Sequence, residues 1–123
     1  MNILVIEDDK PMLKALKFAL NQHGYKVVLA SSEQNAINQL RLHEIDCIVS
    51  DVNLPGESEL VSMVSNLKSH SGDVPVVLIS SNPANPMIDH SLLTGADAFI
   101  PKPIDFELLI DVIRRLTGHP AEH

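Results

Sequence analysis

Two scarcities in this sequence narrow the protein classes to which it can belong. It has a single cysteine, Cys47, so an intramolecular disulfide framework is excluded. Its apolar runs are far shorter than the roughly 20 residues that span a bilayer. The N-terminus, MNILVIEDD, has no basic leader and reaches acidic residues too early for a secretory signal. We therefore expect a cytoplasmic location and no membrane partner.

Positive charge is also scarce. Nine lysines and arginines stand against sixteen aspartates and glutamates, which gives a net charge of -7. A domain that binds nucleic acid needs a basic face to displace the counterions of the phosphate backbone. We therefore expect no direct nucleic-acid binding by this domain. A dinucleotide or flavin module is also disfavoured, because no G-x-G-x-x-G motif follows the first apolar run.

What the chain does contain is a regular alternation of apolar runs and amphipathic segments. Its 123 residues, 45% of them hydrophobic, suit one globular domain. Short apolar runs predict strands, and leucines and isoleucines at helical spacing predict helices. Asp105 is the expected N-cap of the last helix, and Ser31 with Gln34 forms a candidate capping box for the second. The predicted strands are 3–6, 27–30, 47–50, 74–79 and 98–100, and the helical signals lie at 12–22, 36–40, 60–67, 87–93 and 106–116.

Alternation of this kind predicts a particular architecture. Five strand–helix units imply a single α/β domain, with a doubly wound parallel sheet, helices on both faces and right-handed crossovers. Such sheets bind ligands at the carboxyl ends of their strands. Polar residues occur at that point after four of the five runs: Glu7, Asp8 and Asp9 after the first, Asp51 after the third, Ser80 at the fourth and Lys102 after the fifth.

These polar residues indicate phosphoryl chemistry. Clustered carboxylates repel one another unless a cation lies among them, and Mg²⁺ prefers oxygen ligands, often one or two carboxylates beside a phosphate. Lys102 supplies a charge for a phosphate oxygen, and Ser80 supplies a hydrogen-bond donor. Asp51 stands apart from the acidic run and is the natural nucleophile. The residues thus predict that Glu7 and Asp8 hold an ion that allows Asp51 to accept a phosphoryl group.

Together these motifs resemble the receiver domain of two-component response regulators. The resemblance rests on LVIEDD at the first strand end, DVNLPG around Asp51, the strand-end Ser80 and the PKP around Lys102, and it covers about residues 2–117. It implies a flavodoxin-like fold with strand order 2-1-3-4-5. The domain would then be residues 1–117, followed by a flexible C-terminal tail at 118–123.

The resemblance also implies partners and a metal. A sensor histidine kinase or a histidine phosphotransfer protein would phosphorylate Asp51, and a downstream effector protein or domain would read the result. Mg²⁺ would be bound by Asp8, Asp51 and the backbone carbonyl of Asn53, with Glu7 acting through water. Catalysis would be limited to the domain's own phosphorylation and dephosphorylation.

Signal output in the resembling family depends on a hydroxyl and an aromatic residue. Here these would be Ser80 and Phe99, which would alter the face formed by 87–93, 98–100 and the last helix. The resemblance further implies a cis peptide bond before Pro103. A phosphorylation-dependent dimer is a further expectation. The charged pairs of one dimer type are mostly missing, however, because Ala98, Leu108 and Val112 stand at their positions.

Two alternatives stay open. One is a phosphate-independent pseudo-receiver that only binds proteins, and it is supported by the unusual segment GESEL after Asp51. The other is a phosphatase with an aspartyl nucleophile. Such enzymes usually carry a second aspartate two residues further on, where this chain has Asn53, which cannot transfer a proton.

Overall fold

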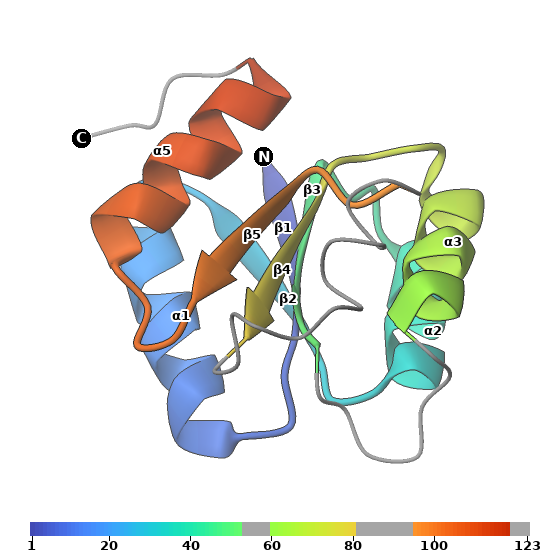
Figure 1. Cartoon of the computed structure of the whole chain (residues 1–123), viewed down its shortest axis with the longest axis horizontal. Coiled ribbons are helices and arrows are strands. Elements are labelled where there is room, and N and C mark those ends of the chain that lie inside the picture. Colours follow the sequence, from blue (N-terminus) through green and yellow to red (C-terminus); the bar gives the residue numbers. More distant parts are fainter. Residues whose placement is uncertain (53–59, 81–94, 119–123) are drawn as a thin grey trace.

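The strands form one parallel sheet, as the sequence predicts. The computed structural model of the protein describes residues 1–52, 60–80 and 95–118. Within them the strand order is β2-β1-β3-β4-β5 (Figure 1), which confirms the α/β fold and the order implied by the resemblance. The strands are β1 (Asn2–Ile6), β2 (Lys26–Ala30), β3 (Cys47–Asp51), β4 (Val76–Ser80) and β5 (Ala98–Pro101).

Helices cover both faces of this sheet. They are α1 (Lys10–Gln22), α2 (Glu33–Leu42), α3 (Leu60–Ser71) and α5 (Phe106–Thr117). The helix predicted at 87–93 lies outside the described residues, as does the tail beyond Gly118. None of the helices in the described ranges has both the length and the apolar character that crossing a bilayer requires.

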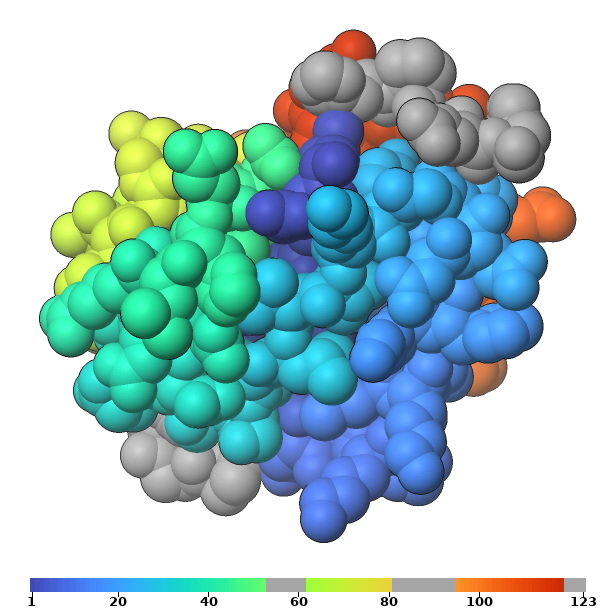
Figure 2. Space-filling model, turned by 180° about the vertical axis from the view of Figure 1, so that it is seen from behind, coloured from blue at the N-terminus to red at the C-terminus, as the bar shows by residue number. Residues whose placement is uncertain are grey.

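Each face of the sheet builds its own hydrophobic core, because successive side chains of a strand point to opposite sides. Leu4 and Ile6 of β1 pack with α2 and α3. Ile3 and Val5 pack with α1 and α5 on the other side. Figure 1 shows the two helix pairs on either side of the sheet, and Figure 2 shows the reverse face, where α1 and α2 lie on either side of β2.

Two predicted boundaries are wrong by two residues. The fourth strand begins at Val76 rather than Val74, because Pro75 has no N–H to give to the ladder. The first helix begins at Lys10 rather than Met12. Its second residue is Pro11, which the first turn accepts because the N–H groups there have no partner within the helix.

The N-cap of α2 is also corrected. The hydroxyl of Ser32, not of Ser31, accepts the backbone N–H of Asn35 at 3.1 Å. Gln34 does not complete a capping box, since its side-chain amide donates to Asn38 instead. At α5 the prediction is confirmed: Asp105 is the N-cap and accepts two backbone N–H groups of the first turn.

Ser32→Ala should lower the free energy of unfolding by about 1 kcal/mol, because it leaves one N–H of the first turn of α2 without its acceptor. Ser31→Ala is the matched control, since Ser31 is the exposed neighbour and α2 is capped by Ser32. Urea denaturation of both variants measures the difference. An equal loss of unfolding free energy in the two variants would contradict the assignment of Ser32 as the N-cap.

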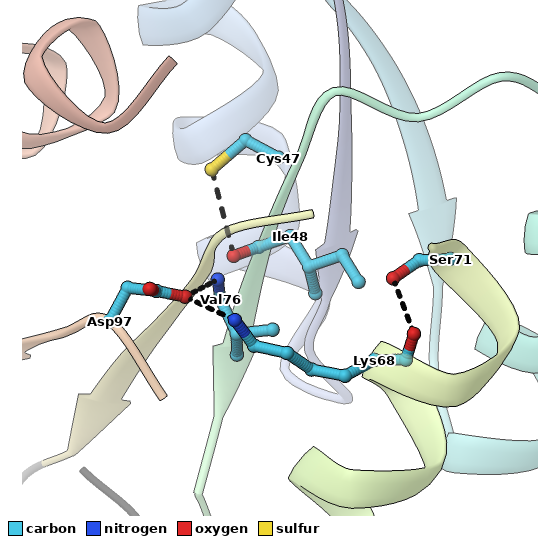
Figure 3. A network of polar contacts seen from close by, with 6 residues as sticks. All are labelled: Cys47, Ile48, Lys68, Ser71, Val76 and Asp97. Carbon is cyan, nitrogen blue, oxygen red and sulfur yellow. Dashed lines mark hydrogen bonds and ion pairs between the residues drawn. The ribbon is translucent and has the colours of Figure 1, made fainter. Parts of the chain in front are cut away.

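The amino ends of β4 and β5 are held in place by Asp97 (Figure 3). Its Oδ2 accepts the backbone N–H of Val76 at 2.8 Å and pairs with Nζ of Lys68 at 2.7 Å. One carboxylate thus ties the start of β4 and the start of β5 to α3.

Nearby Cys47 is fully buried, and burial raises the pKa of its thiol to about 12, so it carries no thiolate at neutral pH.

Candidate functional site at the carboxyl ends of the strands

Three carboxylates meet at the carboxyl ends of β1 and β3. Glu7 follows β1 and is held by its backbone N–H, which donates to the carbonyl of Ala30 at the end of β2. Asp51 is the last residue of β3. Oxygens of Glu7, Asp8 and Asp51 lie within 4.8 Å of one another. Glu7 and Asp51 are buried, whereas Asp8 is exposed, so the cluster opens to solvent on one side.

A lysine completes the cluster. Lys102 follows β5, and its backbone N–H donates to the carbonyl of Ser80 at 2.8 Å. Its Nζ lies 3.7 Å from Oε2 of Glu7 and 3.7 Å from Oδ2 of Asp51. The Lys102–Pro103 peptide bond is cis, the geometry that the resemblance implies. One ammonium therefore lies close to both buried carboxylates.

Ser80 and Phe99 occupy the two neighbouring strands β4 and β5. Ser80 ends β4 and is fully buried. Phe99 pairs in register with Leu78 and is half-buried against the core that α2 and α3 share. Ser80 projects to the same face as Leu78 because they are two residues apart on one strand. The hydroxyl and the aromatic ring thus belong to the same side of the sheet.

Glu7 is the electrostatically unusual member of the site. Burial, and after it the neighbouring Asp51 carboxylate, raise its pKa from 4.5 to about 7. Two interactions oppose these: the charge of Lys102 and the backbone N–H of Asp9, which donates to Oε1 at 3.2 Å. The net pKa of about 7 means that this carboxyl group is only partly ionised at neutral pH.

The donor set fits a hard divalent cation. Oε2 of Glu7 is buried and makes no hydrogen bond among the described residues, and its ion-pair partner Lys102 lies 3.7 Å away, so this oxygen is open to a closer cation. Carboxylate oxygens are the ligands that Mg²⁺ prefers. The exposed Asp8 leaves room for the waters that Mg²⁺ usually retains. By contrast, the predicted ligand Asn53 lies outside the described residues.

One contact at the site was not predicted from the sequence. The hydroxyl of the fully buried Ser50 donates to the backbone carbonyl of Asp51 at 3.0 Å. This bond restrains the peptide group that follows Asp51. Its only sequence signal is a serine inside the apolar run CIVS, which is too weak to distinguish it from a tolerated small residue.

Lys102→Met should destabilise the protein by about 1 kcal/mol at about pH 8 without divalent cations, because two buried carboxylates lose their cation. The loss is kept small by solvent, since the Lys102 side chain is 23% exposed. Urea denaturation gives the value. Lys26→Met is the control, because Lys26 is exposed on β2. A loss no larger than the control's would contradict the ion pairing.

Comparison with known proteins finds similar sequences along nearly the whole chain. The family model of the response regulator receiver domain matches residues 3–114. The phosphate regulon transcriptional regulatory protein PhoB of Escherichia coli (strain K12) is 35% identical over 126 residues, which cover 98% of this chain and 55% of that protein. Response regulator MprA of Mycobacterium avium (strain 104) is 30% identical, covering 94% and 50%. The chain spans about half the length of these curated relatives.

Solved structures share the fold. A response regulator receiver domain protein (CheY-like) from Methanospirillum hungatei JF-1 has a TM-score of 0.86 at 22% identity, covering 95% of this chain and 93% of that one. The receiver domain of sensor histidine kinase PA1611 from Pseudomonas aeruginosa PAO1 has a TM-score of 0.83 at 22% identity, covering 95% and 97%. That structure has a magnesium ion coordinated in its active site cleft.

Proposed function

This chain belongs to the response regulator receiver family of two-component signalling, and we propose from that premise that it accepts a phosphoryl group on Asp51. The observation that carries the proposal is the position of the Asp51 carboxylate. It is buried at the end of β3, within 4.8 Å of two other carboxylates and 3.7 Å from an ammonium. A nucleophile, a cation-binding set and a charge for phosphate oxygens are therefore present at one point.

Asp8, Asp51 and the backbone carbonyl of Asn53 would hold Mg²⁺, with Glu7 contributing through water. When bound, the metal supplies the positive charge that lets an anionic carboxylate approach an anionic phosphoryl group. A divalent cation at this point would offset the repulsion from Asp51, so the carboxylate form of Glu7 would be favoured.

In the reaction, an oxygen of Asp51 forms a bond to phosphorus while the bond from phosphorus to the donor breaks. The donor is a phosphohistidine of a sensor kinase or phosphotransfer protein, and its imidazole leaves. Lys102, whose Nζ lies 3.7 Å from Asp51, would neutralise a phosphoryl oxygen, and the hydroxyl of Ser80 at the end of β4 would donate to another. Attack of water on the acyl phosphate reverses the modification, so the domain catalyses only its own phosphorylation and dephosphorylation.

The phosphorylated state is transmitted by Ser80 and Phe99. A hydroxyl drawn toward the phosphoryl group leaves space on the α2–α3 side of the sheet, and Phe99 is half-buried on that side. Inward movement of the ring would alter the surface around β5 and α5, together with the segment 87–93. That surface would bind the effector protein or domain, and Leu108 of α5 already exposes 41% of its area there. A phosphorylation-dependent dimer would use the same surface.

The test is intact-mass spectrometry after incubation with acetyl phosphate, a small phosphoryl donor, with Mg²⁺ or with a chelator. We expect one phosphoryl adduct with Mg²⁺ and none in chelator. Mapping by proteolysis should place it on the peptide that contains Asp51. An adduct that forms equally well in chelator would remove the metal from the proposal. No adduct, with no Mg²⁺ binding, would favour a phosphate-independent pseudo-receiver.

A further inference from the structure

The peptide group between Asp51 and Val52 is held from both sides. Its carbonyl accepts a hydrogen bond from the hydroxyl of Ser50 at 3.0 Å. Its N–H donates to the backbone carbonyl of Ile79 on β4, also at 3.0 Å. A peptide group that is bonded through both its acceptor and its donor cannot turn without breaking one of the two bonds. The chain direction immediately after Asp51 is therefore fixed.

This peptide group connects the acceptor residue to the next proposed metal ligand. The pairing of β1 with β3 ends at Ile6 and Ser50, so Asp51 lies one residue beyond it. The side chain of Asp51 leaves the chain just before the peptide group, and the carbonyl proposed as a ligand belongs to Asn53, two residues later. The orientation of the peptide group thus influences how two ligands of the same ion are placed relative to each other.

Ser50 is a polar residue in an apolar row of the sheet. It is fully buried and pairs in register with Ile6 on one side and with Leu78 on the other. Both neighbours belong to the core that α2 and α3 share. A buried hydroxyl costs free energy unless it is hydrogen-bonded, so the hydroxyl of Ser50 is kept on the carbonyl of Asp51. An apolar side chain would fill the row as its neighbours do, but it would not restrain this carbonyl.

We propose that Ser50 is a positioning residue of the phosphoryl-acceptor site and that its hydroxyl raises the affinity of the site for Mg²⁺. The inference rests on the proposed function, because it takes Asp51 and Asn53 as ligands of the ion. Mg²⁺ requires nearly octahedral geometry, so ligands that are held in place beforehand bind it more tightly than ligands that must first be ordered. Without the hydroxyl, the peptide group loses its restraint on the carbonyl side.

Amide hydrogen exchange of the metal-free protein measures this restraint. In Ser50→Ala the N–H of Val52 should exchange about fivefold faster, relative to the N–H of Ile48, than it does in the wild type. The N–H of Ile48 donates to Pro75 and is the internal reference on β3. Equal acceleration at both positions would mean that the variant has only lost stability, and it would overturn the inference.

Isothermal titration with magnesium chloride measures the affinity and needs no phosphoryl donor. Ser50→Ala should bind Mg²⁺ about fivefold more weakly than the wild type. Val49→Ala is the control, because Val49 is the fully buried neighbour on β3 that packs on the opposite face of the sheet. This variant loses packing but keeps the hydroxyl, so it should bind Mg²⁺ as the wild type does. Equal weakening in both variants, or unchanged affinity in Ser50→Ala, would contradict the role of Ser50.

A second pair of variants cancels the effect of side-chain volume. Ser50→Thr keeps a hydroxyl, and Ser50→Val has the same shape without it, so the threonine variant should bind Mg²⁺ about fivefold more tightly. Thermal melts verify folding, and Ser50→Ala carries the test if the larger side chains do not fit. A wild type that forms no adduct with acetyl phosphate would overturn the proposed function. An adduct on the wild type, with equal Mg²⁺ affinities in wild type and Ser50→Ala, would overturn the role of Ser50 alone.

Discussion

Asp51→Asn is expected to abolish the phosphoryl adduct while leaving the fold intact. The amide has nearly the shape of the carboxylate but lacks its negative charge and its nucleophilicity, so it cannot form the acyl phosphate. The change also removes one of the two buried negative charges at the strand ends, which should not destabilise the sheet. Intact-mass spectrometry with acetyl phosphate and Mg²⁺ measures the adduct, and circular dichroism verifies the fold.

The matched control is Asp9→Asn. Asp9 belongs to the same acidic run, but it is exposed, is absent from the cluster of carboxylates and makes no side-chain cap to α1. It should therefore accept the phosphoryl group as the wild type does. Retention of the adduct in Asp51→Asn, or its loss in Asp9→Asn alone, would show that the acceptor has been misassigned.

Glu7→Gln should stabilise the protein at about pH 8 in the absence of divalent cations, by up to about 3 kcal/mol. The pKa of Glu7 is about 7 in the folded state against 4.5 ordinarily. Between these two values the folded protein binds more protons than the unfolded chain, so the stability contributed by Glu7 is lost as the pH rises. Below pH 4.5 the stability contributed by Glu7 is fully present. Above pH 7 that stability is lost, and the full cost of burying the ionised carboxylate remains. Glutamine stays neutral throughout and avoids it.

Urea denaturation of wild type and Glu7→Gln in chelator, at about pH 5.5 and about pH 8, measures this effect. The wild type should lose more stability than the variant between the two conditions. Mg²⁺ should reduce the difference at the higher pH, because the cation offsets the buried charge. Glu44→Gln is the control, since Glu44 is exposed in the loop before β3. A wild type and a Glu7→Gln variant with parallel pH dependence would contradict the raised pKa.

The location of the site could be predicted because parallel strands change abruptly from apolar to polar at their carboxyl ends. That change marks Glu7, Asp51 and Lys102 directly in the sequence, and the structure brings these three together. A different local signal, the preference for aspartate at the N-cap, correctly predicted Asp105 at the start of α5.

Other features depend on tertiary contacts that leave no local signal. The choice of Ser32 over Ser31 depends on where β2 ends, and either residue could have capped α2. Glu33 is buried and accepts a hydrogen bond from Asn66 at 2.9 Å, a contact between α2 and α3 that spacing along the chain cannot predict. The raised pKa of Glu7 likewise results from burial by distant residues. Sequence gives the types of groups present, and packing decides how each behaves.

The division of the core by the sheet has a consequence for how a signal can travel. Residues of α2 and α3 form one cluster with one face of the sheet, and residues of α1 and α5 form another with the opposite face. Ser80 and Phe99 project toward the first. A rearrangement there can repack one half of the molecule while the other half, built on Ile3, Val5 and Leu109, keeps its packing. The domain thus combines a deformable layer with a more rigid support. Amide exchange on phosphorylation should change in the first layer and at the output surface around β5 and α5, and it should stay unchanged in α1, which packs in the second layer.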